Sequence, residues 1–148
     1  MAAVSPLIKK QSARLMAVQA VYQASLNEQS LESVVPEYLE HRLSMEVDGE
    51  EIAQPDGALF KKIVLGVEER RGDLGSLIAT HTQAKGEKFE PLIKAIIMCA
   101  SYELLAHCDI DSPIIINDYL NVAHAYFDKG EVGLINGILD NVAKAVRD

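Results

Sequence analysis

The stretch from Leu92 to His107 is apolar on almost every side of a helix, and this restricts the fold more than any other feature of the chain. Pro91 precedes it, at a position where proline favours the first turn of a helix. A helix that is hydrophobic all round has to be enclosed by other elements, because it has no face to present to water. The sequence therefore predicts a helix at the centre of a bundle, with apolar residues on all its sides: Leu92, Ile93, Ile96, Ile97, Met98, Ala100, Leu104 and Leu105.

Four helices are expected before this central one, and capping signals mark the start of the first three. A Ser-Pro pair at residues 5–6 begins the first, which runs to about Asn27. Ser30 and Asp56 are residues of the kind that cap a helix N-terminus, and each precedes a segment with helical apolar spacing. The charged segment 46–56 between those two helices contains Gly and Pro and is expected to be a loop. On the first helix, the expected apolar stripe is Leu15, Val18, Tyr22 and Leu26.

The remaining segments complete an all-α prediction. The third helix is expected to stop near Gly72, and a short fourth helix follows around residues 74–78 and ends near 85–86. After the central fifth helix, a Ser-Pro pair at 112–113 begins the sixth, and the seventh begins near Glu131. We therefore predict an all-α fold, a compact bundle of about seven helices that forms a single domain over residues 1–148.

Composition indicates a globular protein without a membrane segment. No apolar run approaches the roughly eighteen residues that a membrane span needs. The lysines near the N-terminus follow the apolar residues, which is the reverse of the order in a secretory signal. Cys99 and Cys108 would lie on opposite faces of one helix, so they cannot pair with each other, and two unpaired thiols suit a reducing compartment. These observations predict a cytoplasmic protein.

The charge is distributed unevenly along the chain. The formal net charge is −8, which argues against a general nucleic-acid binder. However, no acidic residue occurs before Glu28, whereas Lys9, Lys10 and Arg14 are basic. Lys10 and Arg14 are four residues apart and would share a helix face. Charges beyond about 8 Å are largely screened at physiological salt. The first helix is therefore a candidate local positive surface, with an ordinary solvated face as the alternative.

Catalytic and metal-binding patterns are missing from the sequence. The chain has no glycine-rich phosphate loop and no Gly-x-Ser-x-Gly motif. Its four histidines are scattered singly, without partners at metal-ligand spacing. The acidic pair Asp109 and Asp111 resembles the start of a calcium loop, but Ile114 and Leu120 stand where that loop needs Gly and Glu. We therefore expect a protein that is not an enzyme and has no cofactor or metal.

The last helix contains two glycines where a helix interior disfavours them. Gly133 and Gly137 lie one turn apart, and a glycine costs about 1 kcal/mol relative to alanine in a helix interior. Two bare Cα atoms on one face suggest the close approach of another backbone or of a ligand. Packing against another helix is the favoured interpretation, and Asn136 and Asp140 occupy a neighbouring polar face.

Three separated segments, taken in order, resemble the family of transcription antitermination factors called NusB. They are Ala17-Val18-Gln19-Ala20-Val21-Tyr22 after a basic helix start, Tyr102-Glu103-Leu104-Leu105 with Ile116-Asn117-Asp118, and Leu134-Ile135-Asn136-Gly137-Ile138-Leu139-Asp140. Residues 60–67 also resemble the third-helix segment of that family. The resemblance covers nearly the whole chain, and it implies an all-helical fold of two packed subdomains.

The resemblance also implies a role and a set of partners. NusB proteins bind the boxA element of nascent RNA together with a small-subunit ribosomal protein, NusE. The resulting complex helps RNA polymerase to read through terminators, notably in ribosomal RNA operons. The family's arginine-rich first helix falls on Lys9, Lys10, Gln11 and Arg14, with Gln11 at a position where arginine is common. Phe127 is a candidate stacking face for a base, whereas Leu134 replaces an aromatic residue frequent in the family.

Two alternatives are kept beside this interpretation. The negative net charge and the small number of basic residues in the first helix would also suit a protein-interaction adaptor that kept the NusB scaffold and lost RNA affinity. The RNA-binding head of a ribosomal RNA methyltransferase resembles NusB too. That alternative would require the chain to be a fragment, because no methyltransferase sequence follows Asp148.

Overall fold

The computed structural model describes residues 6–41, 56–82 and 89–147. The expected loop at 46–56 lies outside these ranges, apart from Asp56. The fourth helix ends at Thr80, so the prediction that it ends near 85–86 is wrong. No helix within the described ranges is long and apolar enough to cross a membrane. The described residues contain no strand and form seven helices, which confirms the all-α prediction: α1 (Pro6–Asn27), α2 (Leu31–His41), α3 (Gly57–Glu69), α4 (Arg71–Thr80), α5 (Pro91–Ala106), α6 (Ser112–Tyr126) and α7 (Lys129–Val146).

Side-chain caps fix where three of these helices begin. Ser30 Oγ accepts a hydrogen bond from the Ser33 backbone N–H at 3.2 Å, and Asp56 Oδ1 accepts one from Leu59 at 3.0 Å. Both caps agree with the prediction. Glu90 caps α5, where its carboxylate accepts two backbone N–H bonds at 3.1 and 3.3 Å. Each cap satisfies amide groups that the first turn of a helix leaves without a partner.

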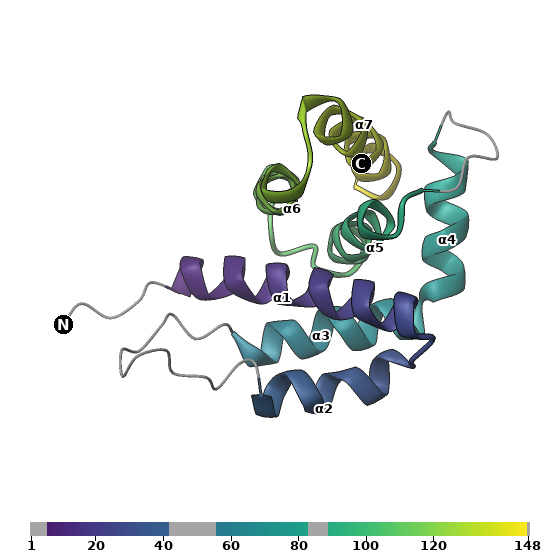
Figure 1. Cartoon of the computed structure of the whole chain (residues 1–148). Helices are drawn as coiled ribbons and strands as arrows, with labels where there is room; N and C mark the ends of the chain where they lie inside the picture. The colour runs from purple at the N-terminus through teal and green to yellow at the C-terminus, as the bar shows by residue number, and fades with distance from the viewer. Residues whose placement is uncertain (1–5, 42–55, 83–88, 148) are drawn as a thin grey trace.

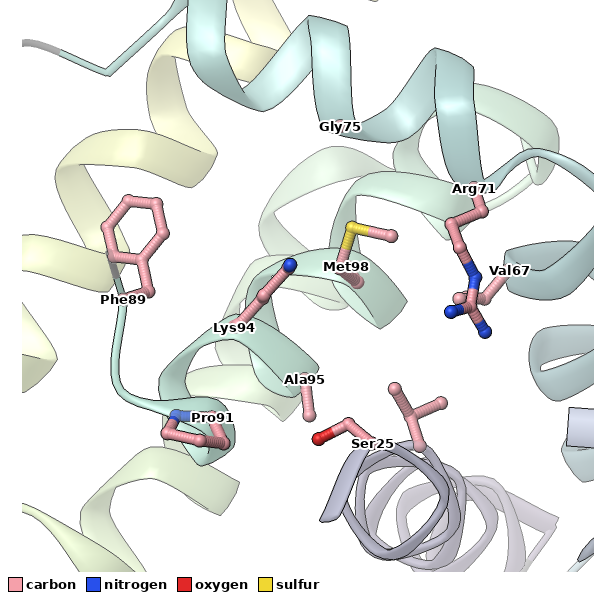
Figure 2. A pocket seen from close by; sticks show the side chains of 10 residues that line it. Ser25, Val67, Arg71, Gly75, Phe89, Pro91, Lys94, Ala95 and Met98 are labelled. Carbon is pink, nitrogen blue, oxygen red and sulfur yellow. The ribbon is translucent and has the colours of Figure 1, made fainter. Parts of the chain in front are cut away.

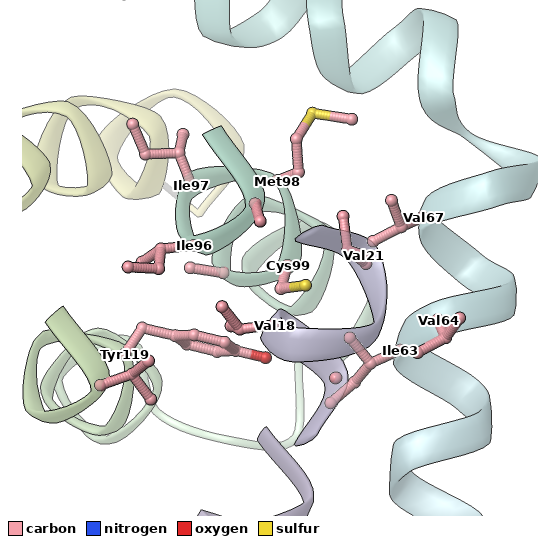
Figure 3. Close-up of a cluster of buried hydrophobic side chains, with 14 of the residues drawn as sticks. Val18, Val21, Ile63, Val64, Val67, Ile96, Ile97, Met98, Cys99 and Tyr119 are labelled. Carbon is pink, nitrogen blue, oxygen red and sulfur yellow. The ribbon is translucent and has the colours of Figure 1, made fainter. Parts of the chain in front are cut away.

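The helix α1 lies between two groups of helices (Figure 1). On one side it packs against α2 and α3, and on the other against α5 and α6, while α7 covers α5 and α6. The helix α5 contacts α1, α3, α4, α6 and α7, which confirms that the apolar helix is central. Figure 3 shows the core where α1, α3, α5 and α6 meet, with these labelled side chains: Val18, Val21, Ile63, Val64, Val67, Ile96, Ile97, Met98, Cys99 and Tyr119.

The buried face of α1 differs from the expected stripe. Leu26 is 55 % exposed, and Leu15 and Tyr22 are only partly buried. Because α1 packs against helices on both sides, small side chains allow its neighbours to come close, since the distance between helix axes depends on the residues at the contact. The buried face is accordingly rich in alanine, and its apolar members are Ala13, Ala17, Val18, Ala20, Val21 and Ala24.

The close-approach glycine is on α3 rather than α7. A Cβ atom added to Gly66 would lie 2.0 Å from Cζ of Tyr102 on α5, so the tyrosine ring occupies the space that a side chain would need. In contrast, Gly133 and Gly137 are exposed, and nothing lies within 4 Å of a Cβ atom added to either. The prediction that they pack against another helix is therefore wrong. The apolar stripe of α7 faces the core, and the glycines lie on another side.

An arginine after α7 holds the end of the central helix. The Arg147 guanidinium donates hydrogen bonds to the backbone carbonyls of Leu104 at 2.7 Å and His107 at 2.7 Å, and also to that of Ile110. The last carbonyls of a helix have no partner within the helix, and a cation there also complements the helix dipole. Arg147 thus ties the end of the chain to the C-terminus of α5.

We predict opposite effects for alanine at the two glycine positions. Gly66→Ala should lower the free energy of unfolding by about 1–3 kcal/mol, because the Tyr102 ring would have to move. Gly137→Ala should raise it by up to about 1 kcal/mol, because the new methyl group meets nothing and alanine favours a helix. Equilibrium unfolding in urea measures both changes. Equal destabilisation of the two variants would contradict this assignment.

Candidate nucleic-acid interface

The first turns of α1 form a locally basic surface, and α1 contains no acidic residue. Lys9 and Lys10 are exposed, and Gln11 is partly buried. The Gln11 side chain reaches from α1 to α6, where its amide Nε2 donates a hydrogen bond to Asp118 Oδ1 at 3.4 Å. The Lys9 carbonyl accepts a hydrogen bond at 3.0 Å from the backbone N–H of Asp56, which joins this turn to the start of α3. Three of the predicted site residues therefore lie together, at the end of α1 remote from α4 (Figure 1).

Arg14 does not belong to this surface. Its side chain is 1 % exposed, so the prediction that it shares an exposed face with Lys10 is wrong. Nε donates to Glu103 Oε2 at 2.7 Å and Nη2 donates to Glu103 Oε1 at 3.0 Å, which forms a bidentate pair. Nη1 donates to Asp118 Oδ2 at 2.8 Å. The guanidinium charge is therefore used inside the protein, where it joins α1 to α5 and α6.

The centre of this buried cluster is Glu103. Its carboxylate also accepts a hydrogen bond from the Tyr119 hydroxyl at 2.6 Å and lies 2.9 Å from His107 Nδ1. Burial alone would raise the pKa of Glu103. Hydrogen bonds from His107 and Arg14 lower it, and the lowering outweighs the effect of burial, so the pKa of Glu103 is below its ordinary value. Glu103 is thus ionised at neutral pH, as a salt bridge with Arg14 requires. Burial beside this carboxylate raises the pKa of Tyr119 well above its usual range.

The predicted stacking residue and its neighbour lie in different environments. Phe127 is partly buried and packs against the core. Tyr126, the last residue of α6, is 47 % exposed, and its hydroxyl accepts a hydrogen bond from Gln19 Nε2 of α1 at 3.2 Å. Of these two adjacent aromatic residues, the sequence favours Phe127 as a stacking face, whereas the structure leaves Tyr126 the more exposed. The available signal was their adjacency at a helix end, where only one of two consecutive aromatic rings can face the core.

A separate cleft lies between α1, α3, α4 and α5, on the part of α1 farther from the lysines (Figure 2). Its volume is about 650 Å³. Two cationic side chains belong to its lining, Arg71, which is paired with Glu68 at 2.5 Å, and Lys94, which is exposed. Within the described residues, no group of three or more His, Cys, Asp or Glu could hold a metal ion. The rest of the lining is mostly apolar: Val21, Ser25, Val67, Gly75, Phe89, Pro91, Ala95 and Met98.

Comparison with known proteins identifies relatives of this chain. A protein of Novosphingobium aromaticivorans named transcription antitermination protein NusB is 38 % identical over 139 residues, which are 92 % of this chain and 93 % of that protein. The protein of the same name from Rhizobium meliloti is 36 % identical, over 92 % of this chain and 86 % of its own length. Among solved structures, T. maritima NusB matches with a TM-score of 0.74 over 91 % of this chain, at 21 % identity and 90 % coverage of that structure.

A second solved structure is described as antitermination factors NusB and NusE in complex with double-stranded RNA. It matches with a TM-score of 0.77 at 18 % identity, over 93 % of this chain and 97 % of that one. Fold and relatives together define a helical transcription antitermination protein, a class that is not enzymatic. The sequence profile described as NusB family matches residues 11–144, and the chain belongs to this family.

We predict that Arg14 stabilises the folded protein. Arg14→Met would leave Glu103 and Asp118 buried without their cation, which should lower the free energy of unfolding by about 3–5 kcal/mol. Lys10→Ala, one turn earlier on the same helix, removes an exposed charge and should change that free energy by less than about 0.5 kcal/mol. Thermal melting at pH 7 compares the two variants. An Arg14→Met protein that melts at the wild-type temperature would contradict the assignment.

Glu103 should make stability sensitive to acid. Its pKa is lower in the folded state than the value of about 4.3 for an unperturbed Glu. The unfolded state therefore binds its proton first, so this stabilisation is complete above about pH 4.3 and is lost as the pH falls through the folded pKa. Urea midpoints measured from pH 6 to pH 3 should fall less steeply for Glu103→Gln than for wild type. The exposed Glu69→Gln is the matched control, and if its pH profile matched that of Glu103→Gln, the cluster would not be the source.

Proposed function

We propose that this antitermination protein binds boxA-type single-stranded RNA of nascent transcripts jointly with the ribosomal protein NusE, within an antitermination complex of RNA polymerase. The observation that carries the proposal is the basic, acid-free start of α1 in a chain whose net charge is −8. A NusB-like fold whose first helix begins with two exposed lysines and no acidic residue can attract phosphate there, although the net charge of the whole chain is negative. The solved complex of NusB, NusE and RNA supports the pairing of these partners.

The contacts available to RNA are few. Lys9 and Lys10 provide two exposed ammonium groups, and the Gln11 amide provides a polar group beside them. Two phosphate contacts to a single strand imply a slope of about −1.4 when the logarithm of the binding constant is plotted against that of the salt concentration. RNA should therefore bind this protein weakly when it is alone. A second RNA-binding protein held beside it would raise the effective concentration of the strand.

We place the protein partner at the cleft lined by Met98 and Phe89. An exposed, largely apolar hollow stabilises a complex when a partner fills it and excludes water. Lys94 and Arg71 at its border would suit an acidic group of the partner. The cleft is lined by the later part of α1, whereas Lys9 and Lys10 lie in its first turns. A protein bound in the cleft would therefore leave the two lysines accessible to RNA.

The test measures RNA affinity with and without NusE. Fluorescence anisotropy of a labelled boxA RNA should show weak binding to the wild type and tighter binding when NusE is added. Lys9→Ala/Lys10→Ala should weaken binding and reduce the magnitude of the salt slope by about 1.4. The matched control is Lys61→Ala/Lys62→Ala, another adjacent pair of exposed lysines on α3, which should leave both quantities unchanged.

Two results separate the parts of the proposal. Lys94→Glu should reduce the increase in RNA affinity that NusE causes and leave binding to RNA alone unchanged. A full increase in that variant would show that NusE does not bind at the cleft. The adaptor alternative draws support from the burial of Arg14, which leaves few cations for RNA. It predicts that the protein binds NusE but not RNA, even in the pair, and that result would overturn the RNA-binding function.

A further inference from the structure

A groove between α2 and α3 takes no part in the proposed function. The two helices lie side by side and run in opposite directions (Figure 1), and among the described elements α2 contacts only α1 and α3. The groove has a volume of about 710 Å³ and shares no lining residue with the cleft proposed for NusE. It is therefore a separate hollow that the described helices leave unfilled.

The middle of this groove is apolar. Val35 is buried at its base, and Leu39 of α2 and Leu65 of α3 are only partly buried. Both leucines pack against the core, while part of each side chain remains accessible in the groove. Removing such apolar surface from water favours association, and a hollow with an apolar base and a polar border is typical of an interaction site.

A proline inside α2 lines the same groove. Pro36 lies within the helix, and its side chain is exposed. Proline destabilises a helix interior more than any other residue, because it has no backbone N–H. Pro36 therefore cannot donate to the carbonyl of Glu32, four residues earlier, and its exposed ring adds little to the core. Residues that break a local rule without a gain in stability are expected where a surface has another role.

The border of the groove is acidic. Glu32 on α2 and Glu69 on α3 are exposed, whereas Glu68 is partly buried and paired with Arg71. Lys61 is the one basic residue in the lining, against these three carboxylates. The groove therefore repels phosphate and attracts lysine or arginine side chains.

We propose that this groove binds a basic amphipathic helix of a protein partner. The helix lays its apolar side on Leu39 and Leu65, and its lysines or arginines pair with Glu32 and Glu69. An amphipathic helix bound in an apolar groove is a recurrent mode of recognition. Because α2 has 11 residues, a partner helix of about three turns would cover it.

Charge disfavours two other occupants. RNA carries phosphates, which the acidic border repels. The chain's own connection between the two helices, residues 42–55, has one basic residue, Arg42, and four acidic ones: Glu46, Asp48, Glu50 and Glu51. A basic segment from another protein matches the groove in both charge and apolar character.

Synthetic peptides of about 14 residues, or four helical turns, test the groove on the full-length chain. The first is a Leu/Lys peptide with one apolar helical stripe, and the second has Glu in place of Lys. The third has the composition of the first in an order that gives no stripe. Backbone amide NMR shifts should place the first peptide on α2 and α3. The other two should bind at least about tenfold more weakly, because one lacks the matching charge and the other the apolar face.

Charge reversal in the groove should exchange this preference. Glu32→Lys/Glu69→Lys should weaken binding of the striped Leu/Lys peptide about tenfold and tighten binding of the Leu/Glu peptide, because attractive pairs become repulsive and the reverse. The matched control is Asp73→Lys/Asp109→Lys, which changes the net charge equally at two exposed residues outside the groove. It should leave both affinities within about threefold of wild type, since distant charges are screened. Melting temperatures show whether each variant is folded.

Four results would overturn the proposal. The striped peptide could leave α2 and α3 unshifted, or the two double variants could weaken its binding equally, in which case only net charge matters. NusE alone could shift the α2 amides, which would make the groove part of that interface. Sedimentation could show a dimer that Glu32→Lys/Glu69→Lys dissociates, which would assign the groove to a second copy of the chain. None of these results affects the proposed RNA binding, because Lys9 and Lys10 lie outside the groove.

Discussion

The structure depends on one buried ion pair, between Arg14 on the first helix and Glu103 on the central one. Removing two charges from water costs several kcal/mol per ion, and their attraction offsets this cost only if the geometry is good and every remaining polar atom has a partner. Here the guanidinium also binds Asp118, and the carboxylate also binds Tyr119. Because these partners come from α1, α5 and α6, the cluster fixes the rotation and the position of α1 along the other two helices. A register shift of α1 would leave at least one charge buried without a partner.

Fixing α1 in this way divides its charged residues between two roles. Arg14 stabilises the bundle, while Lys9 and Lys10 face solvent one turn earlier, where α1 has no acidic residue to compete with phosphate. The same cluster sets α6 against α1, which brings Tyr126 to Gln19. With two exposed lysines at the candidate site and a net charge of −8, the proposed function requires a partner to strengthen binding to RNA.

The sequence predicted the helices well because their signals are local. Capping residues and apolar periodicity located all seven, and the all-round apolar pattern identified α5 as central. Periodicity does not say what lies opposite a face, and for that reason Gly137 was assigned to a packed surface and Gly66 was overlooked. The assignment of Arg14 to the surface failed for a related reason, since a helix face near the end of a helix can be either covered or free. One signal was available: Glu103 is one of only two charged residues in the central helix and lies near its end, away from Lys94, so a buried Glu103 requires a cation from another helix. The role of Arg147 depends on the path of the chain after α7 and has no local signature.

The central claim is that Arg14 is closed within the bundle, so RNA meets the first turn of α1. Backbone amide NMR shifts, followed while unlabelled boxA RNA is added to the labelled protein with NusE bound, test it most directly. Because the NusE-bound state is the reference, shifts caused by the partner do not enter the comparison. The account predicts that the largest changes fall on residues 7–12, with little change on α2. Largest changes on α2 and the outer face of α3, with residues 7–12 unmoved, would contradict it.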